Sequence, residues 1–173
     1  PRFSPDGKRI SWISMERDGY EADLKRLFVQ DLKTGQKTFL TDGFEYDVDE
    51  LQWAANSQSL FFLSTKHAEA QLWEIALKGR KIRQITTGMH DYTSLDVQGG
   101  KILAGRQSYI EPTDLYLVDV KTGAAKQLTA ENKSTLDGLA PISVEKRWVK
   151  TTDGGNMLVW VVLPPNFDKT KKY

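Results

Sequence analysis

Asp-Leu-Lys-Thr-Gly at residues 31–35, followed by Leu-Thr at residues 40–41, is the stretch of sequence that decides the fold. Residues 119–123 repeat it as Asp-Val-Lys-Thr-Gly, and Leu-Thr follows at the same spacing, at residues 128–129. The two copies lie 88 residues apart, which is two steps of about 44. A period of about 40–50 residues that contains short strands is typical of the blades of a β-propeller.

A weaker copy lies between these two, where Ala-Leu-Lys-Gly at residues 76–79 leads to Ile-Thr at residues 85–86. Each copy also follows a tight turn and a strand-like run. In the first unit, Ser-Pro-Asp-Gly-Lys at residues 4–8 precedes Arg-Ile-Ser-Trp-Ile-Ser at residues 9–14. Proline presets φ and Asp-Gly accepts a positive φ, so this segment predicts a turn into a strand. Each unit then ends in a hairpin around the repeated phrase.

We therefore predict an all-β chain that forms a partial β-propeller of about three four-stranded WD-type blades. The repeats cover about residues 1–42, 48–87 and 93–130, within a propeller segment of residues 1–133. The loops between the strands, at residues 15–25, 65–70 and 107–113, vary most between units. Insertions in such repeats map to loops on one face, which is often the binding face.

The repeat stops near residue 132, and residues 134–141 have the composition of a connector. A different hairpin follows, with its turn at Asp153-Gly154 and with Pro164-Pro165 ending its second strand. We expect residues 142–173 to be the first hairpin of a truncated second domain. The chain begins without Met and ends directly after this hairpin, so we expect both ends to be cuts within a longer protein, with any targeting signal outside it.

The composition excludes several classes of function. Lys and Arg number 24 and Asp and Glu 23, so a net charge of +1 gives no reason to expect a nucleic acid or membrane partner. The absence of Cys excludes disulfides, thiolate metal sites and cysteine nucleophiles. It does not decide between the periplasm and the cytoplasm of a bacterium.

The repeated turn and closing phrase resemble the propeller repeats of the prolyl oligopeptidase family and of TolB-like proteins. Residues 148–154 and 158–168, Trp-Val-Lys-Thr-Thr-Asp-Gly and Leu-Val-Trp-Val-Val-Leu-Pro-Pro-Asn-Phe-Asp, resemble the entry into the peptidase domain of that family. The combination is most similar to bacterial dipeptidyl or acylaminoacyl peptidases. The resemblance implies a serine peptidase that cleaves short peptides, with an α/β-hydrolase domain whose active site the propeller caps. The alternative is a non-enzymatic propeller of TolB type that acts as a protein-binding scaffold.

The chain itself contains no catalytic set that we can identify. The nucleophile motif Gly-x-Ser-x-Gly does not occur, and both histidines, His67 and His90, fall inside the repeats, upstream of where a hydrolase serine would lie. We therefore predict no catalytic residue here, no peptidase activity for the segment alone, no cofactor and no metal site. An acidic run at residues 45–50 suggests calcium ligands, but it lacks the spacing of an EF-hand and is better explained as a solvated loop.

Arg106 is our single candidate for substrate binding. It ends a strand directly before the loop at residues 107–112, where its guanidinium could reach a substrate carbonyl or carboxylate, although a surface salt bridge is the commoner role. The expected partners are peptide substrates and the protein's own peptidase domain. Because three units cannot close a propeller of 4–8 blades, exposed edges could also produce a homodimer or a strand-swapped assembly.

Overall fold

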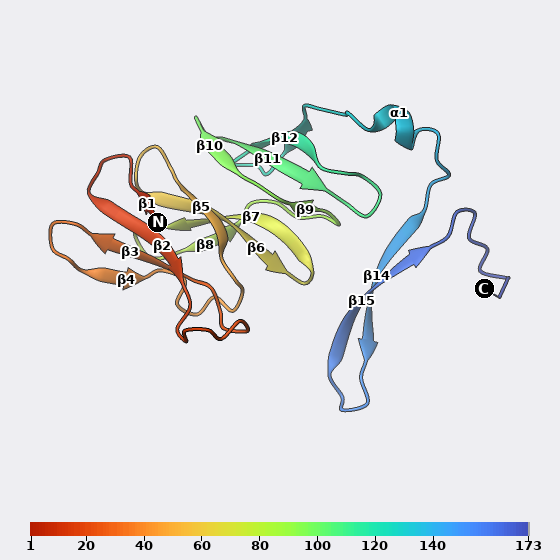
Figure 1. Cartoon of the computed structure of the whole chain (residues 1–173), viewed down its shortest axis with the longest axis horizontal. Coiled ribbons are helices and arrows are strands. Elements are labelled where there is room, and N and C mark those ends of the chain that lie inside the picture. Colours follow the sequence, from red (N-terminus) through yellow and green to blue (C-terminus); the bar gives the residue numbers. More distant parts are fainter. Residues whose placement is uncertain (173) are drawn as a thin grey trace.

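The computed structural model describes residues 1–172 and is built almost entirely from antiparallel strands (Figure 1). Three sheets follow one another along the chain, each with its strands paired in sequence order, and a separate two-stranded hairpin comes last. The prediction of an all-β chain with about three four-stranded blades is thus confirmed. Among residues 1–172, no helix has the length and apolar composition needed to cross a bilayer.

We call the three sheets blades 1, 2 and 3. Blade 1 contains β1 (Arg2–Phe3), β2 (Arg9–Ser14), β3 (Arg26–Asp31) and β4 (Lys37–Phe39). Blade 2 contains β5 (Asp49–Trp53), β6 (Ser59–Lys66), β7 (Glu69–Ala76) and β8 (Ile82–Gln84). Blade 3 contains β10 (Asp96–Gln98), β11 (Lys101–Gln107), β12 (Asp114–Asp119) and β13 (Ala125–Gln127).

Two further features join blade 3 to its surroundings. A short strand that the sequence did not reveal, β9 (Asp91–Tyr92), pairs with the end of β11 and makes blade 3 five-stranded. After blade 3, a single turn of helix, α1 (Lys133–Leu136), lies in the connector. The connector leads to the hairpin of β14 (Ser143–Lys150) and β15 (Asn156–Leu163).

The repeated phrase forms the same turn in blades 1 and 3. Asp31 Oδ1 accepts hydrogen bonds from the backbone N–H groups of Lys33 (3.0 Å) and Thr34 (2.9 Å) and from the Thr34 hydroxyl (3.1 Å). Asp119 Oδ1 accepts the three equivalent bonds, at 3.0, 2.9 and 3.0 Å. An Asp that binds the backbone two and three residues ahead stabilises a turn locally, which is why the phrase specifies the hairpin wherever it occurs.

The Leu-Thr or Ile-Thr pair that closes each repeat is hydrogen-bonded to the third strand of the same blade. The hydroxyl oxygens of Thr41, Thr86 and Thr129 accept the backbone N–H of a leucine at the same place in each blade, at 3.0, 3.0 and 2.9 Å. These leucines are Leu27, Leu72 and Leu115. The residue before each of these threonines also donates its backbone N–H to the backbone carbonyl of the leucine in its own blade. These donors are Leu40, Ile85 and Leu128.

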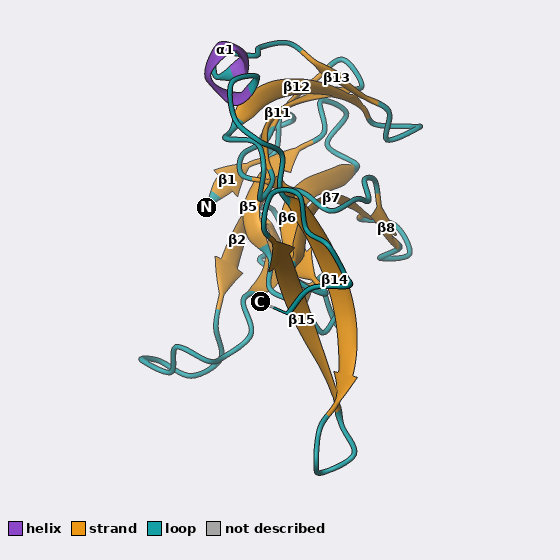
Figure 2. Cartoon of the chain, turned by 90° about the vertical axis from the view of Figure 1, so that its right-hand side faces the viewer, coloured by secondary structure: helices purple, strands orange, loops and turns teal. Residues whose placement is uncertain are grey.

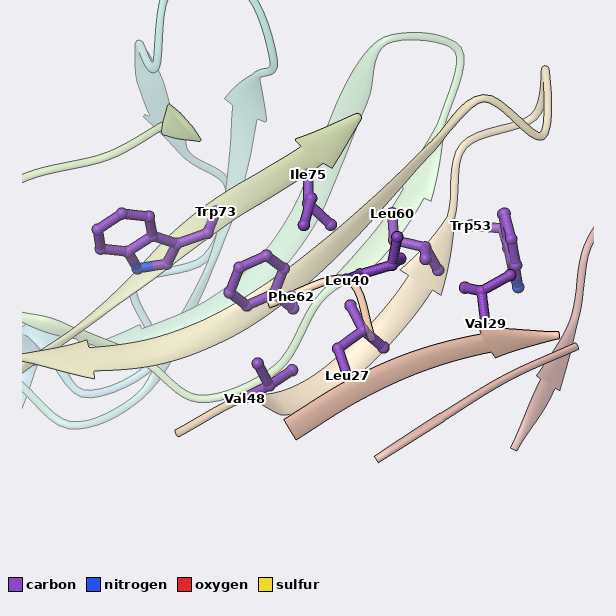
Figure 3. Close-up of a cluster of buried hydrophobic side chains, with 9 residues drawn as sticks. All are labelled: Leu27, Val29, Leu40, Val48, Trp53, Leu60, Phe62, Trp73 and Ile75. Atoms are coloured by element: carbon purple, nitrogen blue, oxygen red, sulfur yellow. The ribbon is translucent and has the colours of Figure 1, made fainter. Parts of the chain in front are cut away.

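The core lies between the blades, and blade 2 is buried on both faces. One cluster joins blades 1 and 2 and contains Leu27, Phe62 and Trp73 among its nine buried residues (Figure 3). The second cluster joins blades 2 and 3 and contains Phe61, Leu72 and Ile102. Six consecutive residues of β6, from Ser59 to Ser64, are therefore buried. Both faces of β6 are apolar because the strand is packed between two neighbouring sheets.

Candidate functional site

The hairpin β14–β15 sits against loops of blades 2 and 3, and this junction is the candidate site (Figures 1 and 2). Lys146 Nζ lies 2.8 Å from Glu69 Oε1, at the start of β7. The rings of Trp148 and His67 meet edge to face with centroids 5.5 Å apart. In blade 3, the ring of Tyr109 lies 5.2 Å from that of Trp160. The loops of blades 2 and 3 that the sequence marked as variable therefore lie on the face that carries the hairpin.

A half-open pocket of about 200 Å³ opens at this junction. Its walls combine a carboxylate pair, an imidazole, amide and hydroxyl groups, and two aromatic rings. The lining residues are Ala68, Glu69, Met89, His90, Asp91, Gln107, Ser108, Tyr109 and Trp160. Such a mixture of apolar rings and a few polar groups can hold a small polar group or one side chain of a peptide.

His90 is the titratable group of the pocket whose environment is most clearly changed. Burial, together with the positive charge of Arg106, lowers the pKa of His90 from its ordinary value, so the neutral form prevails near pH 7. Its Nε2 atom is buried and has no hydrogen-bond partner among residues 1–172. No hydrogen bond joins His90 or His67 to a serine within residues 1–172.

Arg106 lies beside the pocket without lining it. It is on β11, opposite Asp114 of β12 and Tyr92 of β9. Its guanidinium stacks on the ring of Tyr116, with Cζ 3.6 Å from the ring centroid. Burial raises the pKa of Tyr92 despite the nearby guanidinium. These contacts use Arg106 for packing within blade 3, and its role in substrate binding stays a prediction.

The acidic run at residues 45–50 does not gather into a metal site. Asp47 accepts the backbone N–H of Lys25 at 2.7 Å, and Asp49 pairs with the Lys25 ammonium at 2.6 Å. These carboxylates thus tie the loop after blade 1 to β3. No group of three or more potential metal ligands occurs within residues 1–172.

A second, wider pocket of about 580 Å³ lies between blade 3 and the connector. It is bounded by the loop at residues 109–111 on one side and by residues 130–142 on the other. Leu139 and Ile110 on its walls are 62% and 52% exposed. Its walls contain more apolar than charged groups, and nothing in them resembles a catalytic pair.

Sequence reasoning missed the residues that build the junction. Glu69 and Lys146 are 77 positions apart, and neither belongs to a motif. The available signal was the two-residue period of a strand, which places residues 146 and 148 on one face of the predicted hairpin without showing what that face contacts.

Comparison with known proteins matches this architecture. Residues 1–105 match the family model described as the dipeptidyl peptidase IV (DPP IV) N-terminal region. Over all 173 residues the chain is 62% identical to dipeptidyl-peptidase 5 of Porphyromonas gingivalis, of which it covers 25%. The chain thus spans about a quarter of the length of the curated relatives it matches.

Solved structures share the fold at low sequence identity. The acylaminoacyl peptidase of Pyrococcus horikoshii superposes with a TM-score of 0.76 at 18% identity, over 92% of this chain and 24% of the peptidase. TolB of Acinetobacter baumannii superposes with a TM-score of 0.60 at 19% identity, over 73% of this chain and 31% of TolB. Because this family model covers residues 1–105, more than half of the chain, the chain belongs to the dipeptidyl peptidase IV N-terminal region family and is a propeller segment of the prolyl oligopeptidase type.

Proposed function

We propose that this chain is the propeller segment of a serine peptidase that hydrolyses short peptides, and that the segment restricts access to an active site outside it. The observation that carries the proposal is the 62% identity to a dipeptidyl-peptidase 5 along the entire chain, hairpin included. A match at that level along the whole chain supports the same fold and the same place within a longer peptidase. The expected partners are therefore peptide substrates and a peptidase domain that continues from residue 142.

The segment supplies no chemistry of its own in this proposal. A serine peptidase needs a nucleophile, a base within hydrogen-bond reach and a group that orients the base. Within residues 1–172, the serines and the two histidines do not form such a set. The residues described here would instead shape the route to the active site and hold the peptidase domain in place.

The test compares the 173-residue chain with the longer protein that contains it. Both are treated with a fluorophosphonate probe, which labels an activated serine. We expect labelling of the longer protein and none of the chain alone. The same pair is assayed on a dipeptidyl chromogenic substrate and on its N-acetylated form, because only a dipeptidyl peptidase depends on the free amino terminus. A folded longer protein that neither takes the label nor cleaves either substrate would overturn the proposal.

The competing function is a TolB-type scaffold without catalysis. It is supported by the superposition with TolB, which extends over 73% of the chain. The acylaminoacyl peptidase superposes over 92% of the chain, so the peptidase alternative accounts for more of the fold. A longer protein that is inert in both assays would favour the scaffold.

A further inference from the structure

The ion pair between Glu69 and Lys146 differs from the other ion pairs of residues 1–172. It connects residues 77 positions apart, whereas the next most distant pair, Lys25 with Asp49, spans 24. The two side chains are 18% and 21% exposed, which is close to the 20% and 7% of the local pair Arg26–Asp23 and far below the 68% and 61% of Lys133–Asp137. An ion pair with little solvent around it is weakly screened, and its geometry is correspondingly strict.

Aromatic rings surround the pair from the hairpin side. Lys146 and Trp160 are directly opposite in the ladder of β14 and β15, so they share one face of the hairpin. The Lys146 ammonium lies 5.5 Å from the centroid of the Trp160 ring, within the range of a cation–π contact. Trp160 in turn contacts Tyr109 of blade 3. The ring therefore links the ion pair on blade 2 to the neighbouring blade.

The turn between β6 and β7, which immediately precedes Glu69, has a strained backbone. His67 and Ala68 form a two-residue turn and both have positive φ, 53° and 58°. Turns of this kind favour Asn and Gly, because other side chains crowd the backbone in the left-handed region. Strained conformations persist where the surroundings fix them and often mark functional positions. Here the turn directs the His67 ring to Trp148 and begins β7 at Glu69.

We propose that Glu69 and Lys146 are a positioning pair. Together with the flanking ring contacts, this pair fixes the position and orientation of the β14–β15 hairpin relative to the blades. One contact would leave the hairpin free to pivot. Contacts of the hairpin with two loops, on blades 2 and 3, remove that freedom. Whatever continues from β15 then starts from a defined orientation. The inference does not depend on the parent protein being a peptidase, because it concerns only contacts within this chain.

The test uses amide hydrogen exchange of the 173-residue chain. A two-stranded hairpin is barely stable alone, so its amides stay protected only while it is docked. We expect Glu69→Lys and Lys146→Glu each to speed exchange in β14 and β15 at least about tenfold, because each leaves a like-charge contact in a poorly solvated site. The double variant restores the pair with its charges exchanged, and its hairpin exchange should return to within about threefold of the unmodified chain.

Two comparisons make the result specific. Exchanging the charges of the exposed pair, with Lys133→Glu and Asp137→Lys, should leave hairpin exchange unchanged. The milder variants Glu69→Gln and Lys146→Gln report on the same contact if a charge reversal unfolds the chain. The proposal is overturned if Glu69→Gln and Lys146→Gln leave the hairpin as protected as before. It is also overturned if the folded double variant is no better than the folded single ones, or if in the milder variants the amides of β6 and β11 lose as much protection as those of the hairpin.

Discussion

The turns at residues 31–35 and 119–123 have nearly the same sequence and the same internal hydrogen bonds, yet they lie in different surroundings. Gly35 and Gly123 have φ values of +72° and +73°. A Cβ added to Gly35 would meet nothing closer than 4.0 Å, whereas at Gly123 it would come within 2.2 Å of the carbonyl oxygen of Ile85 in blade 2. No other blade packs against Gly35 in the turn of blade 1, whereas Gly123 in the turn of blade 3 packs tightly against blade 2. Equal local structure therefore does not imply equal energetic importance.

The same contrast holds for the leucines at the start of the third strand. Leu27 and Leu72 are fully buried, while Leu115, at the same place in blade 3, is 41% exposed. The closing Leu40 and Ile85 are 3% and 8% exposed, while Leu128 is 48% exposed. The difference arises because blades 1 and 2 each have a following blade to cover this face, and blade 3 has none within the chain. Within residues 1–172, this face of blade 3 is therefore an apolar surface exposed to solvent.

The largest effect we expect concerns association. The 173-residue chain on its own should self-associate, because a second copy can cover the leucines of blade 3 as blade 3 covers the equivalent face of blade 2. Light scattering at increasing concentration should show dimers or larger species, and Leu115→Lys combined with Leu128→Lys should shift the chain toward the monomer. Met15→Lys combined with Met157→Lys, at side chains 42% and 49% exposed in the loop after β2 and in β15, is the matched control. A chain that stays monomeric throughout contradicts the prediction.

The next effect separates the buried and exposed leucines. Leu27→Ala should lower the free energy of unfolding by about 2–5 kcal/mol, because it removes a fully buried side chain and leaves a cavity. Leu115→Ala should lower it by less than about 1 kcal/mol, since that side chain is already half in water. Urea denaturation of both variants provides the comparison. Equal losses would mean that the face of blade 3 is covered in solution.

A smaller effect separates the two glycines. Gly35→Ala should cost about 1–2 kcal/mol, the price of a left-handed conformation for a residue with a Cβ. Gly123→Ala should cost about 1–3 kcal/mol more, because blade 3 must also move away from Ile85. Thermal unfolding of the two variants measures the difference. If Gly35→Ala proves as destabilising as Gly123→Ala, the contact of the third-blade turn with blade 2 carries no energy.

The smallest effect is the pH dependence of the two aspartates. Hydrogen bonds from the Thr34 backbone N–H and hydroxyl lower the pKa of Asp31. The pKa of Asp119 is lowered first by its bond to the Lys101 ammonium, 2.7 Å away, and then by the equivalent Thr122 groups. A carboxyl whose pKa is depressed in the folded state stabilises the fold above about pH 4, and this contribution is lost as the pH falls further. Both effects are screened by solvent.

We therefore expect Asp119→Asn to flatten the acid limb of the stability curve more than Asp31→Asn does. Urea midpoints between pH 7 and pH 3 provide the measurement, with the unmodified chain losing the most stability on acidification. Lys101→Gln removes the ammonium that lowers the pKa of Asp119. In that background, the stability that Asp119 contributes and that is lost on acidification should become similar to the contribution of Asp31. A steeper acid limb in either asparagine variant would show that the sign of the shift is wrong.

Much of the fold was predictable because it depends on local chemistry. The turns follow from Asp, Gly and Pro at fixed places, and the strands from alternation between them. The extra strand β9 was not predictable, because a two-residue segment has no periodicity of its own and pairs only where β11 passes it. Arg106 was correctly placed at the end of a strand, but its stacking on Tyr116 depends on the register of β11 against β12.

The site was less predictable than the fold. Glu69, Tyr109, Lys146 and Trp160 come from three regions of the chain and match no motif, so their meeting depends on how the hairpin folds back on the blades. The strained turn at His67 and Ala68 gave no signal either, since it contains neither Asn nor Gly.

The repeated phrase by itself determined that blades 1 and 3 would contain hairpins of one kind, because an aspartate, a threonine and a glycine satisfy their own turn without help from the rest of the chain. Only the tertiary structure decided which copy of the turn packs against another blade and which leucines are buried. It also decided where the β14–β15 hairpin contacts the blades. These properties depend on contacts between residues far apart in the sequence, such as Ile85 with Gly123, 38 positions apart (123 − 85), and Glu69 with Lys146, 77 positions apart. Such contacts exist only when the sheets are stacked, and a local pattern contains no record of them.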